Sequence, residues 1–81
     1  MLKIEHVDKG IVIRTQNDAV FIENRYKHAL TTMIKSHLRM PRSRWSWLVG
    51  DTLCTEYNGG ILVRQEEQLL VPDERLMELL I

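Results

Sequence analysis

The sequence predicts a small α+β domain in which one antiparallel sheet packs on one main helix, in the approximate order β-β-α-β-β-β-α. Three observations predict it: a β-branched hairpin pattern near the start, one long amphipathic stretch that ends at Pro41, and an Asn58-Gly59-Gly60 turn between two apolar runs. No linker divides the 81 residues and no internal repeat is visible, so residues 1–81 are predicted to form a single domain.

The first segment predicts a β-hairpin. Apolar and polar residues alternate over residues 2–6, residues 8–10 supply an Asp-Lys-Gly turn, and the run Ile11-Val12-Ile13 resumes β-branched character. Residues 19–22 then fit either a short buried strand or a first helical turn, because Asn17-Asp18 suits both a turn and a helix N-cap.

The helical interpretation of residues 19–22 is preferred, since one apolar stripe then runs from about Asp18 to about Met40. The stripe has helical spacing and consists of Ile22, Tyr26, Ala29, Leu30, Met33 and His37. Pro41 ends this helix, because the residue before a proline is restricted to extended backbone. If the helix begins only at Asn24, it remains the longest element.

The second half predicts further strands. Residues 42–49 alternate, so an extended backbone would place Arg42 and Arg44 on one side and Trp45 and Trp47 on the other. Residues 52–57 and 61–63 are predicted strands on either side of the Asn-Gly-Gly turn, and residues 69–71 are a candidate short strand. Pro72-Asp73-Glu74 then predicts the start of a short C-terminal helix.

The charges are segregated along the chain although their sum is zero. Residues 24–50 hold six basic residues and no acidic one, whereas residues 51–81 hold seven acidic residues against Arg64 and Arg75. Such a chain is expected to present faces of opposite sign, which suits docking onto another molecule or onto a copy of itself.

Composition indicates a cytoplasmic protein that does not enter a membrane. Cys54 is the only cysteine, so an intramolecular disulfide is impossible and nothing argues for an oxidising compartment. Residues 1–10 carry four charges and lack the apolar core of a signal peptide. No window approaches the length of apolar sequence that a membrane-spanning helix needs.

The sequence predicts no enzyme, cofactor, metal or small-molecule substrate. Cys54 lies in a predicted strand, where a free cysteine usually serves as a small buried hydrophobe. His6, His28, His37 and Cys54 show none of the short paired spacings of zinc ligands. The carboxylate pairs Glu66-Glu67 and Asp73-Glu74 are interpreted as a solvated surface and a helix start.

Two functional hypotheses remain. The leading one is a protein that docks to other proteins, as a self-associating component or as an inhibitor or adaptor of a larger complex, because large apolar residues crowd the C-terminus. Its candidate interface residues are Trp45, Trp47, Leu76, Leu79, Leu80 and Ile81. The alternative is a nucleic-acid-binding regulator that uses the basic segment 25–44. Its candidate residues are Lys27, Lys35, Arg39, Arg42 and Arg44.

One resemblance favours an assembly role. A β-hairpin, then an amphipathic helix with Ala29-Leu30-Thr31-Thr32-Met33-Ile34, then Trp45-Ser46-Trp47-Leu48-Val49-Gly50-Asp51, resembles the baseplate wedge proteins of contractile phage tails. The resemblance covers residues 1–53 and implies that the helix and the aromatic-glycine turn pack against neighbouring subunits. After residue 53 the sequence departs from that family, because the family's second long helix is missing.

Overall fold

The computed structural model describes residues 1–80 and confirms the α+β class. The strands form two antiparallel sheets, rather than the single sheet that the sequence predicts, with orders β1-β2-β3 and β4-β5-β6-β7. The strands are β1 (Lys3–Val7), β2 (Gly10–Arg14), β3 (Ala19–Glu23), β4 (Ser46–Val49), β5 (Thr52–Tyr57), β6 (Gly60–Arg64) and β7 (Gln68–Pro72). The helices are the 3-10 helix η1 (Asn24–Tyr26), α1 (Lys27–Arg39) and the 3-10 helix η2 (Asp73–Leu79).

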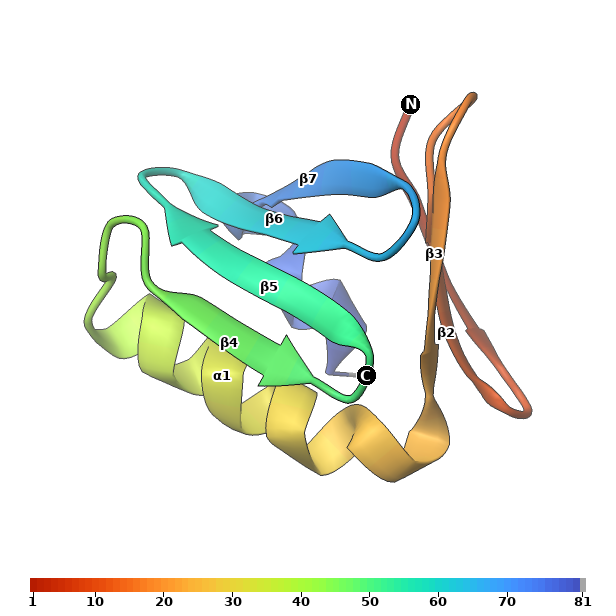
Figure 1. The fold of residues 1–81 in the computed structure, drawn as a ribbon, viewed down its shortest axis with the longest axis horizontal. Helices are drawn as coiled ribbons and strands as arrows, with labels where there is room; N and C mark the ends of the chain where they lie inside the picture. The colour runs from red at the N-terminus through yellow and green to blue at the C-terminus, as the bar shows by residue number, and fades with distance from the viewer. Residues whose placement is uncertain (81) are drawn as a thin grey trace.

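The two sheets stand at a steep angle to one another. Figure 1 shows the four-stranded sheet from its outer side, the three-stranded sheet nearly edge-on at the right, and α1 running along the lower edge. The helix η2 lies behind the four-stranded sheet and packs on both α1 and β1. The inner faces of both sheets and the helices therefore enclose one core.

The core follows the alternation of the strands. On β2 and β3 the buried residues are Ile11, Ile13, Val20 and Ile22, and on β6 and β7 they are Ile61, Val63, Leu69 and Val71. The helices contribute Leu30, Met33, Ile34, Leu76 and Leu79. Because side chains on a strand alternate between faces, the intervening residues of each strand form an outer face.

An internal repeat relates the two sheets, and the sequence analysis missed it. The pairs Lys3–Arg14 and Val7–Gly10 of the β1/β2 hairpin recur, fifty positions later, as Leu53–Arg64 and Tyr57–Gly60 of the β5/β6 hairpin. The third strand follows in the same register in both cases. We call residues 3–26 the first unit and residues 52–79 the second unit.

The repeat extends to single hydrogen bonds. Asn24 N donates to Lys9 O across 3.0 Å in the first unit, and Asp73 N donates to Gly59 O across 2.9 Å in the second. Each of these two donors begins a 3-10 helix. The sequence carried the matching signal as Gly-Ile-Val-Ile-Arg at residue 10 and Gly-Ile-Leu-Val-Arg at residue 60.

The preferred helical interpretation of residues 19–22 is wrong. These residues belong to β3, where Val20 pairs with Ile13 and Ile22 pairs with Ile11. Both Val20 and Ile22 are buried, so pairing with β2 and burial of alternate side chains outweigh the helical spacing of the stripe. The predicted first hairpin, the Asn-Gly-Gly hairpin, the strand at residues 69–71 and helical structure after Pro72 are confirmed.

Side chains join the two sheets at the edge of β3. The Gln65 side chain donates from Nε2 to Phe21 O across 2.6 Å and accepts from Phe21 N across 3.4 Å. Nearby, Ala19 N donates to Oε1 of Glu67. These contacts satisfy backbone groups that an edge strand otherwise leaves open.

Within residues 1–80, no helix is long and apolar enough to cross a membrane.

Candidate functional site: a basic hollow and an apolar sheet face

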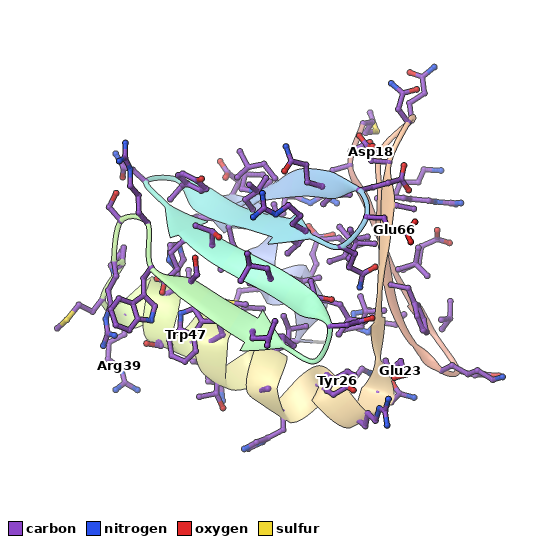
Figure 2. All side chains as sticks on the ribbon, in the orientation of Figure 1. Asp18, Glu23, Tyr26, Arg39, Trp47 and Glu66 are labelled. Atoms are coloured by element: carbon purple, nitrogen blue, oxygen red, sulfur yellow. The ribbon has the colours of Figure 1, made fainter. Side chains whose placement is uncertain are left out.

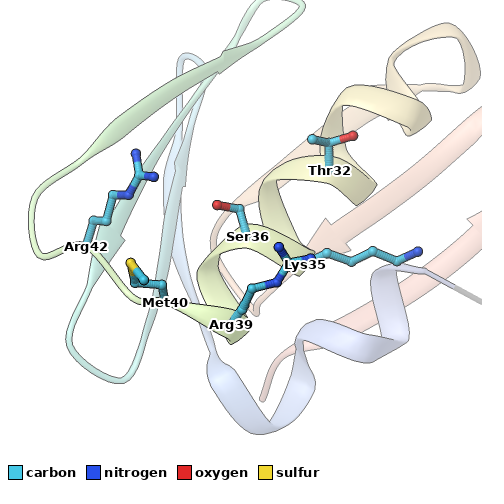
Figure 3. A pocket seen from close by; sticks show the side chains of 6 residues that line it. All are labelled: Thr32, Lys35, Ser36, Arg39, Met40 and Arg42. Carbon is cyan, nitrogen blue, oxygen red and sulfur yellow. The ribbon is translucent and has the colours of Figure 1, made fainter.

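A basic hollow lies where α1 ends. Its volume is about 370 Å³, and its lining residues are Thr32, Lys35, Ser36, Arg39, Met40 and Arg42. Positions 32, 35, 36 and 39 share one side of the helix because they are three or four residues apart. Figure 3 shows the side chains from α1 on one side of the hollow and Arg42, from the loop that follows, on the other.

The hollow gathers three of the five residues that the sequence suggests for nucleic-acid binding. Among residues 1–80, neither Lys35, Arg39 nor Arg42 forms an ion pair with a carboxylate, and no acidic residue lines the hollow. Lys27 does not line it, because it begins α1 three turns before Arg39. Figure 2 shows Arg39 at the end of α1 that lies away from the three-stranded sheet.

One buried residue, Glu56, forms hydrogen bonds to the loop between α1 and β4, which lies beside the hollow. Its backbone accepts from Arg44 N across 2.7 Å and donates to Trp45 O across 2.7 Å, and its Oε1 also accepts from Arg42 N across 3.3 Å. Arg44 has a φ of 65°, in the left-handed region that costs a residue with a Cβ about 1 kcal/mol. The loop is therefore held in one conformation by contacts to the core.

The side chain of Glu56 belongs to a buried polar cluster. His37 on α1 donates from Nδ1 to Glu56 Oε1 and from Nε2 to Asp73 Oδ1, each across 2.7 Å. Trp47 donates from Nε1 to Glu56 Oε2 across 2.6 Å. Ionised carboxylates only accept, so both ring nitrogens of His37 carry a proton and the ring is an imidazolium.

The cluster shifts the titration of its own members. Burial favours a neutral His37, but the hydrogen bonds to Glu56 and Asp73 outweigh burial and raise the pKa of His37 above 6.5. Burial also favours a neutral Glu56, but the bonds from Trp47, His37 and the Arg42 backbone lower the pKa of Glu56 below 4.5. The ion pair is therefore formed at neutral pH.

The two tryptophans of the predicted interface differ in their surroundings. Trp45 is 49% exposed, and the Arg42 guanidinium lies over its ring at 5.1 Å from the centroid. Trp47 is half-buried and turns inward to Glu56. The extended backbone expected over residues 42–49 is found only from Ser46 onward, and Arg44, with its left-handed φ, interrupts it before that residue.

The remaining interface candidates lie at the C-terminus. Leu76 and Leu79 are buried in the core of the domain. Leu80 is half-buried and packs on the core. Ile81 lies outside the described residues.

An apolar face that sequence reasoning missed covers the outer side of the four-stranded sheet. We call it the leucine face, and it consists of Leu48, Leu53, Tyr57, Leu62 and Leu70. Leu48 pairs with Leu53 and Leu62 pairs with Leu70, so the four leucines cross the sheet as one diagonal stripe. Leu48 is 71% exposed and Leu70 is 52% exposed.

Cys54 lies in the core of the domain, on β5. Its side chain is buried, and burial raises the pKa of the Cys54 thiol to about 12. A thiolate therefore scarcely forms at neutral pH. Among residues 1–80, no three His, Cys, Asp or Glu side chains come together as metal ligands.

The sequence contained a signal for the polar cluster. The alternation that buries Thr52 and Cys54 on β5 also turns Glu56 inward, and a buried carboxylate requires partners. His37 at the end of the apolar stripe of α1 is the partner with a positive charge. Asp73, interpreted from sequence as part of a helix start, is the second carboxylate of His37.

Comparison with protein families, curated proteins and solved structures finds no match to this chain. The resemblance to baseplate wedge proteins therefore stays a prediction, and the function rests on the geometry of the chain itself.

Proposed function

We propose that this protein is a non-enzymatic assembly component that self-associates through the leucine face. The observation that carries the proposal is the apolar stripe from Leu48 to Leu70, which crosses all four strands of the sheet and has no covering element among residues 1–80. Contiguous exposed apolar surface of this kind is typical of protein–protein contacts.

The internal repeat supplies a comparison within the same chain. The outer face of the first unit carries Lys3 and Glu5 at the positions where the second unit carries Leu53 and Thr55. Glu5 forms an ion pair with Arg14 across 2.7 Å, so this part of the face is charged, although Val7 and Phe21 are exposed elsewhere on it. The fold therefore accepts charged residues at these positions, and packing alone does not require Leu53 to be apolar.

The charge of the leucine face favours a second copy as the partner. Arg64 is the one charged residue on the outer face of the four-stranded sheet, whose other polar members are neutral. Two such faces can pack together without opposing rows of like charge. Sheets pack face to face at about 10 Å through interdigitated side chains, and the exposed leucines supply that layer.

The test is the native mass by size-exclusion chromatography with light scattering, at low and at high salt. We expect a dimer under both conditions, because apolar contacts are not screened by salt. Leu70→Gln should shift the protein toward monomer. Phe21→Gln is the matched control, because Phe21 occupies the position of Leu70 in the first unit and is also exposed.

Circular dichroism must show that both variants keep the fold. A wild-type protein that is monomeric in both salts contradicts self-association. A dimer that Leu70→Gln and Phe21→Gln weaken equally contradicts the leucine face as the contact.

A further inference from the structure

We propose that the basic hollow, together with Trp45, binds single-stranded nucleic acid, with a phosphate in the hollow and an unpaired base on the Trp45 ring. This inference is independent of self-association, because the hollow and the leucine face share no residue.

The hollow has the chemistry of a phosphate site. Lys35 and Arg39 line it from α1, Arg42 lines it from the loop that follows, and the Ser36 hydroxyl adds a neutral donor. The Thr32 hydroxyl already donates to His28 O across 3.0 Å. Cations that no carboxylate neutralises attract an anion, and arginine offers paired donors that match phosphate oxygens.

The neutral net charge of the chain does not cancel this local charge. Glu56 is buried against His37, Asp73 also binds His37, and Glu78 binds Arg75. Three of the seven acidic residues in the second half are thus paired with basic side chains outside the hollow, and none of the seven lines it. The hollow keeps an uncompensated positive charge within a neutral protein.

Trp45 supplies the surface for a base. Its ring is half-exposed, and the Arg42 guanidinium lies over one face of it. Arg42 also lines the hollow, so this residue connects the Trp45 ring to the proposed phosphate site. The bonds of Glu56 to Arg42, Arg44 and Trp45 fix the loop, including the left-handed Arg44. Strain at a fixed surface loop is characteristic of binding sites.

These features favour a single strand over a duplex or an acidic protein. Base stacking on an aromatic ring needs an unpaired base, which a duplex does not offer. An acidic peptide satisfies the cations but has no flat ring for Trp45. A positively charged groove next to an exposed aromatic side chain is the common arrangement in proteins that bind single strands.

The experiment is fluorescence anisotropy with a labelled oligothymidine of about 12 nucleotides, within the usual site size. We expect binding at low salt whose affinity falls steeply as salt rises. Lys35→Gln should reduce the slope of log K against log salt by about 0.7, the value of one phosphate contact on a single strand. Lys27→Gln is the matched control, because it removes the same charge from the same helix outside the hollow.

Trp45 gives a second, uncharged readout. Trp45→Ala should weaken binding roughly 5- to 100-fold, as expected for the loss of one stacked base, while leaving the salt slope unchanged. Trp45→Phe should retain most of the affinity, because it keeps a ring. Trp45 is exposed, so neither variant is expected to disturb folding, which circular dichroism checks.

Four outcomes overturn the proposal. They are no binding at low salt, equal effects of Lys35→Gln and Lys27→Gln, no effect of Trp45→Ala, and competition by polyglutamate as effective as by unlabelled oligothymidine. The last outcome assigns the hollow to an acidic protein instead. Competition by unlabelled single strands, but not by the same mass of duplex, supports the proposal that the hollow binds single-stranded nucleic acid.

Discussion

His37 on α1 and Glu56 on β5 form an ion pair in the interior, with 2.7 Å between Nδ1 and Oε1 and both side chains almost fully buried. The pair joins the main helix to the four-stranded sheet. Through the backbone of Glu56 it also positions the loop that carries Arg42 and Trp45. Stability and the shape of the basic hollow therefore depend on the same two residues.

Stability should depend on pH through this pair. Bonds to carboxylates raise the pKa of His37 against the opposing effect of burial, so its contribution is complete below pH 6.5 and is lost as pH rises through the folded-state pKa. The pKa of Glu56 is lowered, so its contribution is complete above pH 4.5 and is lost as pH falls through its folded-state value. We expect the pair to stabilise most between those two values.

Urea denaturation across pH measures this dependence. The decline in stability below pH 9.0 should include the loss of the His37 contribution, whereas Cys54, whose pKa burial raises from 9.0, contributes only above that value. NMR titration of the His37 ring in the native protein assigns the effect directly. A folded-state pKa of His37 at or below 6.5 would contradict the ion pair.

The two tryptophans should differ sharply in their contribution to stability. Trp47→Phe removes the Nε1 donor of a buried carboxylate and should lower the free energy of unfolding by about 2–3 kcal/mol. Trp45→Phe, on the exposed side of the loop, should change it by less than about 0.5 kcal/mol. Urea midpoints of the two variants compare them, and equal values would show that the bond to Glu56 contributes nothing.

Alanine substitutions at two glycines with positive φ should distinguish the cost of backbone strain from the cost of a steric clash. An added Cβ at Gly50, where φ is +64°, lies 2.5 Å from the Tyr26 ring, whereas at Gly59, where φ is +98°, it meets nothing within 4 Å. Gly59→Ala should cost about 1–2 kcal/mol from backbone strain. Gly50→Ala should cost roughly 2–4 kcal/mol because overpacking adds to that strain. Thermal unfolding measures the loss of stability in both variants. A loss for Gly50→Ala that is no larger than the loss for Gly59→Ala would contradict the prediction.

The Cys54 thiol should be inert in the folded protein. Burial raises its pKa to about 12 and blocks access, so a thiol reagent at pH 8 should modify it only when the domain unfolds. The modification rate should therefore increase with urea in parallel with unfolding measured by circular dichroism. Rapid modification of the native protein would show that β5 is more accessible than the fold indicates.

Much of the fold followed from local patterns. The turns at residues 8–10 and 58–60 and the alternation around them predict both hairpins, because these signals need no distant contact. Residues 19–22 were misjudged because their apolar spacing fits two periods, and only pairing with β2 decides between them. The division into two sheets depends likewise on contacts between distant segments.

The candidate sites were predictable in part. The basic hollow follows from helical spacing, since Lys35 and Arg39 are one turn apart and Arg42 comes directly after the helix. The leucine face was missed because Leu48, Leu53, Leu62 and Leu70 lie on four strands, and only their register places them together.

The internal repeat also shows which positions can be substituted without changing the strand pairing of either unit. All six residues of the basic hollow lie at positions 32–42, between the end of the first unit and the start of the second. Met33, Ile34 and His37 lie in the same stretch and are buried, so a changed segment has to keep these three side chains. The six lining positions can therefore change the ligand preference, while the buried positions between them keep α1 attached to the core.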